Sequence, residues 1–257
     1  MKGLYRLVNI EFMRWLLFLM LLCIAALVIP ILIMNSAVNN YAMLHNHSRF
    51  EDLYIASGSA FLFPIFLALV CLYFLKTFYA GYWGSKSVYT YLTLPIRRES
   101  LYLSKLIVFM ISLLLLILVQ FVSIRLGYAL FVNKAGDYID GKFIMNNGLY
   151  LAFVRSDFFH LLLPFSFSRI LSSCSMLLVI TTGIYYAALC ERSKKYWGVI
   201  ALGAAALLLY RVLTYRLNES SHYFEPTSLY PSSLMLLLLS GFFLWHGLRM
   251  IKRGTIA

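Results

Sequence analysis

Four polar side chains lie within or at the ends of long apolar segments: Gln120, Ser123, Arg169 and Ser173. Gln120 and Ser123 are three residues apart, a spacing that places both on one face of a helix. In a membrane, uncharged groups of this kind either form hydrogen bonds between helices or line a path for a substrate. Arg169 has apolar residues on both sides. It therefore either reaches the lipid headgroups or binds an anionic group of a lipid or substrate at the outer mouth.

Two stretches of the sequence match a catalytic or metal-binding motif only in part. Residues 136–142 match the phosphate-loop pattern G-x-x-x-x-G-K, but Phe143 stands where a Ser or Thr would bind magnesium. His45 and His47 are close together, and a solvated loop explains them better than a metal site does. The apolar segments contain no acidic residue to act as an acid or base. We therefore predict no catalytic residue, metal site or cofactor site in this chain, and no ATP hydrolysis of its own.

The composition is typical of a protein embedded in lipid. Hydrophobic residues make up 62% of the 257 residues and charged residues 12%, whereas a soluble domain carries about 25% charged residues. Apolar runs of about 18 or more residues are long enough to cross a membrane as helices. The sequence predicts an all-α integral membrane protein with six spans, at residues 15–34, 58–75, 106–124, 170–190, 197–214 and 232–248.

The positive charges indicate how the spans are oriented. Segments 1–14, 76–105, 191–195 and 249–257 hold 14 of the 22 Lys and Arg residues and three of the ten acids. Cytoplasmic segments are the ones enriched in Lys and Arg, so both termini are predicted in the cytoplasm of a multi-pass protein of the bacterial plasma membrane. The net charge of +12 does not indicate nucleic-acid binding, because the charges lie at the ends of apolar runs and form no single basic face.

Two segments outside the spans carry further predictions. Residues 2–14 place apolar side chains on one helical face and Lys2 and Arg6 on another, as in an amphipathic helix lying on the inner leaflet. The alternative is a charged flank that only sets the topology. Residues 125–169 form the large outer loop, and its aromatic end, from Asp157 to Phe167, either enters the outer leaflet or caps the bundle.

The longest cytoplasmic stretch between spans is the segment 82–105, which is basic and rich in tyrosine. Its apolar and aromatic side chains share one face of a short helix: Val88, Tyr91 and Leu92. Pro95 ends that helix, because the residue before a proline disfavours the helical conformation. The third span is then opened by Arg97, Arg98 and Glu99. Tyrosine is a frequent anchor in protein interfaces, so this segment is the predicted contact for a partner protein.

The run Thr93-Leu94-Pro95-Ile96-Arg97-Arg98, followed by Leu101-Tyr102-Leu103-Ser104-Lys105, resembles the inner loop of exporter-type ABC transporter permeases. The six spans, the N-terminal helix and the chain length also fit that family. The resemblance implies a permease dimer, formed with a second copy or a paralogue, on a cytoplasmic ABC ATPase dimer that holds ATP and Mg. It also implies that Val88 to Leu94 form a coupling helix. The implied ATPase-coupling residues are Val88, Tyr89, Tyr91, Leu92, Leu94, Pro95, Arg97, Arg98 and Glu99.

The function expected from this resemblance is that of a membrane subunit of an ATP-driven exporter, which is not itself an enzyme. The aromatic outer segments favour a hydrophobic or amphipathic cargo, such as a peptide, an antibiotic or a lipid. The alternative is a membrane immunity or sensor subunit that transports nothing and binds a peptide through its outer loops. Membrane lipid is an expected partner in either case.

Overall fold

A computed structural model of the chain describes residues 2–43, 49–83, 98–138, 148–194, 197–218 and 229–252. Within these ranges the chain is helical and contains no strand. Helices satisfy every backbone N–H and C=O group within one segment, as the hydrocarbon of a membrane requires. The helices are α1 (Lys2–Met43), α2 (Phe50–Ala56), α3 (Ser59–Trp83), α5 (Arg98–Tyr138), α6 (Gly148–Arg155), α7 (Asp157–Leu162), α8 (Phe167–Arg192), α9 (Trp197–Asn218) and α10 (Leu229–Lys252).

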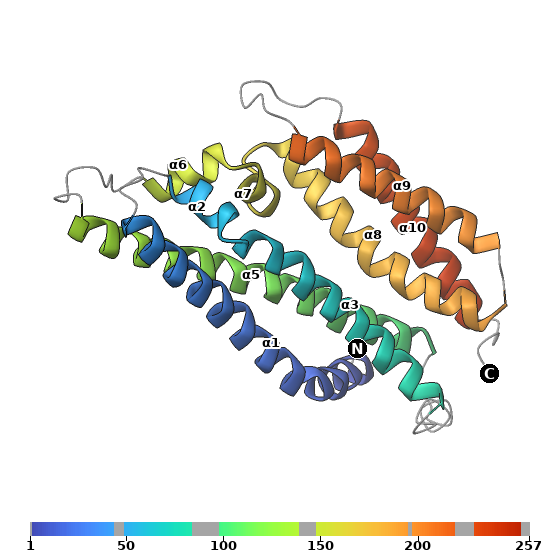
Figure 1. The fold of residues 1–257 in the computed structure, drawn as a ribbon. Helices are drawn as coiled ribbons and strands as arrows, with labels where there is room; N and C mark the ends of the chain where they lie inside the picture. Colours follow the sequence, from blue (N-terminus) through green and yellow to red (C-terminus); the bar gives the residue numbers. More distant parts are fainter. Residues whose placement is uncertain are drawn as a thin grey trace.

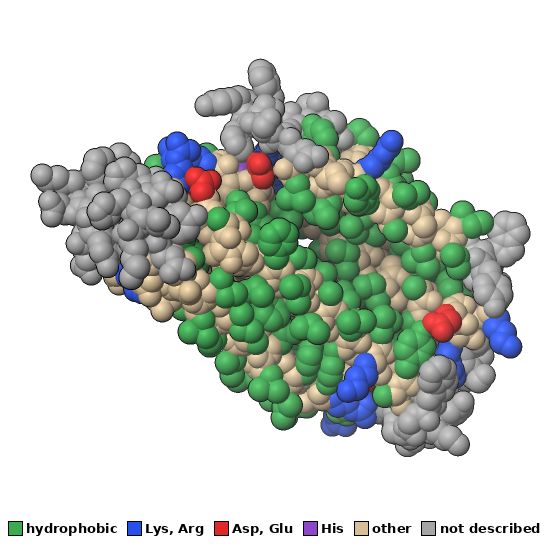
Figure 2. Space-filling model, viewed as in Figure 1, with side chains coloured by type: hydrophobic (Ala, Val, Ile, Leu, Met, Phe, Trp, Pro, Cys, Tyr) green, Lys and Arg blue, Asp and Glu red, His purple; other side chains and the backbone are tan. Residues whose placement is uncertain are grey.

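The six longest helices have the length and composition of membrane spans, as the sequence predicts. They are α1, α3, α5, α8, α9 and α10. Large apolar side chains such as Leu17, Phe61 and Leu207 are exposed on their outward surfaces. Hydrophobic side chains cover the middle of the face shown in Figure 2, and most charged side chains lie near its ends. These features support an all-α, multi-pass membrane protein.

The helices form two groups that run between two distinct ends of the bundle. Helix α1 packs along α5 with α3 beside them, and α8 packs along α10 with α9 beside them. Both termini lie at the end where α3 finishes and α5 begins (Figure 1). We call this the terminal end, which the predicted topology places in the cytoplasm. The opposite end, where α2, α6 and α7 lie, is the distal end.

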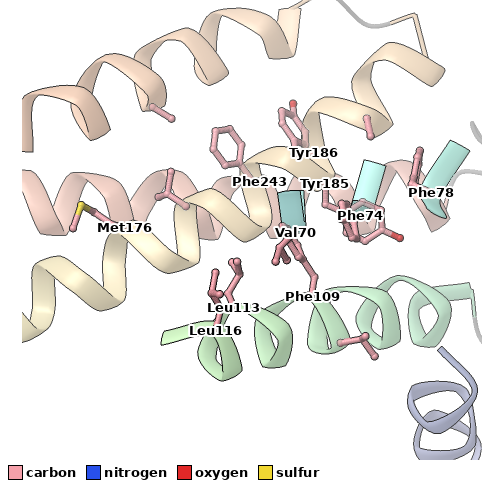
Figure 3. Close-up of a cluster of buried hydrophobic side chains, with 14 of the residues drawn as sticks. Val70, Phe74, Phe78, Phe109, Leu113, Leu116, Met176, Tyr185, Tyr186 and Phe243 are labelled. Atoms are coloured by element: carbon pink, nitrogen blue, oxygen red, sulfur yellow. The ribbon is translucent and has the colours of Figure 1, made fainter. Parts of the chain in front are cut away.

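Aromatic side chains in the centre of the bundle join the two groups (Figure 3). Phe74 of α3 stacks on Phe109 of α5, with ring centroids 4.3 Å apart, and meets the edge of Tyr185 of α8 at 5.3 Å. The next residue of α8, Tyr186, stacks on Phe243 of α10 at 4.9 Å. Close packing is a main source of helix association in lipid. Helix α8 therefore connects the α1–α3–α5 group to α10.

A second aromatic cluster closes the distal end. Phe159 of α7 is fully buried. Its ring lies 6.1 Å from that of Phe50 and 5.3 Å from that of Tyr54, both on α2, and 5.0 Å from that of Phe153 on α6. The sequence left open whether this aromatic segment enters the lipid or caps the bundle. Its helical part, α7, caps the bundle.

Short-range signals explain where the distal helices begin. Ser156 and Ser166 are the N-caps of α7 and α8, and their side chains accept hydrogen bonds from the backbone N–H groups of Phe159 and Arg169. Gly58 has a φ of +79°, which only glycine adopts readily, and it allows the chain to turn from α2 into α3. These local signals fix the position of Arg169 in the first turn of α8.

Helix α1 extends further toward the N-terminus than the predicted span. The segment 2–14, predicted as a separate interfacial helix, is helical and continues without a break into the first span. Its placement on the surface of a membrane remains a prediction.

Helix α5 extends beyond the predicted end of the third span, from residue 124 to Tyr138. The first part of the predicted outer loop is therefore helical. A polar contact with α1 stabilises this extension, because Nζ of Lys134 donates to Oδ1 of Asn35 at 2.6 Å and to Oδ1 of Asn39 at 2.5 Å.

Candidate functional site

Most of the predicted ATPase-coupling residues fall outside the described part of the chain, between the end of α3 and the start of α5. These residues are Val88, Tyr89, Tyr91, Leu92, Leu94, Pro95 and Arg97. Arg98 and Glu99 lie in the first turn of α5. The structure thus describes the two helix ends that flank the predicted coupling segment.

Polar contacts connect both flanking helix ends, those of α3 and α5, to α8 and α10 of the other group. Oε1 of Glu99, at the start of α5, forms an ion pair with Nζ of Lys252 at the end of α10, at 3.1 Å. The hydroxyl of Tyr79, in the last turns of α3, donates a hydrogen bond to the carboxylate of Glu191 near the end of α8. A displacement of either flanking helix end therefore acts on α8 and α10 as well.

The third acid of the terminal end lies between α1 and α5. Glu11 is buried and pairs with Arg14 of its own helix at 3.6 Å. Glu11 also lines a cavity of about 10 Å³ together with Trp15, Phe74, Thr77, Phe78, Lys105 and Val108. Nζ of Lys105 lies 5.6 Å from the centre of the Phe78 ring, a cation–π distance. Lys105 is therefore packed against α3 within the bundle.

At the distal end, Arg169 of α8 contacts His160 of α7. Nη1 of Arg169 lies 3.0 Å from Nδ1 of His160, and Nε2 of His160 lies 2.7 Å from the carbonyl oxygen of Val154. An arginine only donates and a carbonyl only accepts. Nδ1 therefore accepts, Nε2 carries the proton, and the imidazole is the neutral Nε2–H tautomer.

A second arginine reaches the same histidine from α9. Nη2 of Arg216 donates to the carbonyl oxygen of His160 at 3.0 Å, and Nη1 donates to Oγ of Ser173 at 2.8 Å. The side chains of Arg169 and Arg216 are both buried, with relative exposures of 9% and 6%. Helices α7, α8 and α9 thus meet at His160, whose imidazole contacts Arg169 and whose backbone carbonyl contacts Arg216. We call His160, Arg169, Ser173 and Arg216 the distal basic cluster.

Gln120 forms a separate buried contact on the other side of α7. Its Nε2 donates to the hydroxyl of Tyr54 at 2.8 Å. Within the described ranges, Oε1 of Gln120 and Oγ of Ser123 are buried without a hydrogen-bond partner. Burial raises the pKa of Tyr54 well above its ordinary value, and the hydrogen bond from Gln120 opposes this only in part. The hydroxyl of Tyr54 therefore stays neutral and can both accept from Gln120 and donate.

The four residues predicted to line a path thus fall into two groups. Arg169 and Ser173 meet in the distal basic cluster, and Gln120 and Ser123 share one face of α5. Helix α7 lies between the groups, because Phe159 packs on Tyr54 and the next residue, His160, belongs to the basic cluster. The two groups are neighbours at the distal end.

Sequence reasoning missed Arg216 and His160 as members of this site. The predicted fifth span stopped at residue 214, which placed Arg216 in a loop, whereas α9 continues to Asn218. Arg169 is buried, whereas three other cations near the ends of the predicted spans are exposed: Lys76, Arg125 and Arg211. The signal available in the sequence was that Arg216 follows the predicted fifth span by two residues, which is less than one helical turn.

Comparisons of this chain with models of protein families, with curated proteins and with solved structures found no match.

Proposed function

We propose that this chain is the membrane-spanning permease subunit of an ATP-driven exporter. In this proposal two permease chains form the translocation path, and a dimer of cytoplasmic ABC ATPases binds ATP and Mg and drives it. The cargo is a hydrophobic or amphipathic molecule such as a peptide, an antibiotic or a lipid. The chain itself hydrolyses nothing.

The observation that carries the proposal is that both helix ends beside the predicted coupling segment form polar contacts with α8 and α10. Glu99 and Tyr79 bind Lys252 and Glu191, so α5 and α3 are connected to α10 and α8 at the terminal end. A partner that pushes on the segment between Trp83 and Arg98 would move both groups of helices together. Rigid-body movement of this kind is a common way to switch a membrane path between two states.

The topology is tested first. Tyr91→Cys, in a variant without the four native cysteines, is expected to react with a membrane-impermeant maleimide in inside-out vesicles and to stay unlabelled in intact cells. Labelling in intact cells would place the segment outside and remove the basis of ATPase coupling.

Coupling is tested by affinity purification of the chain from its native membrane together with any ABC ATPase that copurifies, and by reconstitution of the complex in vesicles. We expect ATP hydrolysis by the complex and none by the chain alone. Tyr91→Gly and Arg97→Glu/Arg98→Glu are expected to leave hydrolysis largely intact and to reduce cargo export about tenfold or more, because they disturb the anchor of an interface. Export at the wild-type rate in both variants would contradict the coupling role. Normal function with the ATPase deleted would favour an immunity or sensor subunit.

A further inference from the structure

A small cavity with polar walls lies between α1, α3 and α5 toward the terminal end. Its volume is about 10 Å³, and its polar lining residues are Glu11 of α1, Thr77 of α3 and Lys105 of α5. We propose that this cavity binds one water molecule, which joins the Glu11 carboxylate to the Lys105 ammonium group. The water needs neither an ATPase nor a cargo, so this inference is tested separately from the proposed function.

The size of the cavity fits a single water molecule. One buried water needs a space of about 10–15 Å³, and the cavity has about 10 Å³. A lipid headgroup or a hydrated metal ion requires more room than this. The remaining lining residues are apolar or aromatic: Trp15, Phe74, Phe78 and Val108. An occupant therefore finds its polar partners on Glu11, Thr77 and Lys105.

Lys105 gives the strongest reason for an occupant with an acceptor atom. An ammonium group carries three donors and no acceptor, and Lys105 is partly buried. Among the residues that the structure describes, Nζ of Lys105 forms no hydrogen bond and no ion pair, and it lies 5.6 Å from the centre of the Phe78 ring. A cation–π contact replaces only part of the lost hydration. Phe78 also lines the cavity, so a water oxygen there lies beside the ammonium group and can accept from it.

Glu11 supplies the acceptor that such a water needs for its own protons. Its side chain is 11% exposed, and Oε1 lies 3.6 Å from Nη1 of Arg14. This distance is that of an ion pair and is long for a hydrogen bond, so the carboxylate retains sites that can accept. Glu11 and Lys105 form no direct ion pair, although both belong to the described part of the chain. A water accepts from the ammonium group while it donates to the carboxylate, which neither a cation nor an anion can do.

Thr77 completes the set of partners. Its Oγ1 donates to the backbone carbonyl oxygen of Phe74 at 2.8 Å. The hydroxyl proton is therefore used, and the oxygen remains able to accept. A buried water typically forms about three hydrogen bonds. One accepted from Lys105 and one donated to each of Glu11 and Thr77 give that number.

The water would connect three segments that carry other predictions. Glu11 lies in the segment 2–14, which the sequence predicts on the inner leaflet. Thr77 and Lys105 lie on α3 and α5, the two helices that flank the predicted coupling segment. An exchangeable polar link at this position joins the start of α1 to both flanking helices.

A crystal structure grown from a lipid phase tests the site directly. The chain is purified without any ATPase, and the data must extend to a resolution that shows ordered waters. We expect one water within hydrogen-bond distance of Nζ of Lys105 and of the Glu11 carboxylate. A cavity without such density between ordered side chains would overturn the proposal, and so would direct contact between Lys105 and Glu11.

A matched pair of variants tests the site by stability. Thr77→Val keeps the shape of the side chain and removes one partner of the water, so we expect the melting temperature to fall by about 2–4 °C. Thr182→Val is the control, because the Thr182 hydroxyl also donates to a backbone carbonyl, that of Leu178 at 2.6 Å, and Thr182 does not line the cavity. An equal fall in the control would contradict the proposal, because it would reflect the loss of a bond to the backbone alone.

A third variant shows whether Thr77 and Lys105 act through the same water. Lys105→Met removes the donor and is expected to fold, because Glu11 remains paired with Arg14. In the Lys105→Met background, Thr77→Val is expected to lower the melting temperature much less than in the wild-type chain, since the water has lost the cation that holds it. The same decrease in both backgrounds would refute a shared water, because Thr77 and Lys105 would then be independent.

Discussion

Glu99 and Lys252 join the first turn of α5 to the last turn of α10, with Oε1 and Nζ 3.1 Å apart. The two residues are 153 positions apart in the sequence, and Glu99 is the last of the residues predicted to couple to an ATPase. Both side chains are partly exposed, and exposed ion pairs contribute about 0–1 kcal/mol to stability. The importance of this pair therefore lies in connecting the two groups of helices.

The Glu99–Lys252 pair gives the first prediction. Glu99→Lys alone is expected to reduce export with little change in the melting temperature, because it replaces an attraction by a repulsion at the terminal end. The exchange Glu99→Lys/Lys252→Glu is expected to restore export, as measured with the reconstituted complex. If the double exchange is as impaired as the single variant, the pair does not transmit the movement.

The hydrogen bond between Tyr79 and Glu191 gives the second prediction. Tyr79→Phe removes the donor and is expected to lower the free energy of unfolding by about 1 kcal/mol, measured by denaturation in mild detergent. Tyr73→Phe is the control on the same helix, because Tyr73 contacts Phe18 and Trp15 through its ring, which phenylalanine retains. Equal losses of unfolding free energy in both variants would show that the hydrogen bond from Tyr79 to Glu191 does not stabilise the fold.

The buried contact between Gln120 and Tyr54 gives the third prediction. Tyr54→Phe and Gln120→Leu each remove one partner of a buried hydrogen bond, so each is expected to cost about 1–3 kcal/mol of stability. The double variant is expected to cost less than the sum of the two, since neither group is then left alone in the core. Strict additivity of the two changes would contradict a direct contact.

The close approach of α9 to α8 gives the fourth prediction. A Cβ added at Gly198 would lie 2.5 Å from Sγ of Cys190 and 2.7 Å from the hydroxyl of Tyr186, so Gly198→Ala requires these two side chains or their helix to shift. Gly203→Ala is the matched control on α9, because its Cβ would meet nothing within 4 Å. We expect a lower melting temperature for Gly198→Ala and an equal or higher one for Gly203→Ala, since alanine favours a helix. A harmless Gly198→Ala would contradict this packing.

The long spans could be predicted from the sequence because hydrocarbon requires a continuous run of about 18 or more apolar residues. The ends of the helices could not. The charge of Lys134 suggests a loop position, yet α5 continues past it, and Asn35 and Asn39 of α1 accept hydrogen bonds from its ammonium group. A contact between segments almost a hundred residues apart leaves no local signal.

The candidate site was predicted only in part for the same reason. Arg169 and Ser173 were identified because they interrupt apolar surroundings, and that signal is local. Their association depends on Arg216 and on the docking of α7, which sets His160 between two helices. The spacing from His160 to Arg216 spans 56 residues and has no periodicity, so the cluster emerges only in three dimensions.

The length of α1 and α5 has a mechanical consequence. With 42 and 41 residues, the two helices are each about 60 Å long at about 1.5 Å per residue, twice the thickness of about 30 Å that hydrocarbon occupies. The contacts that join the two helices run from Trp15 and Phe109 to Asn39 and Lys134, about 36 Å along α1 at about 1.5 Å per residue. A small tilt of this helix pair at the terminal end would therefore displace its distal end by a larger distance, as in a lever.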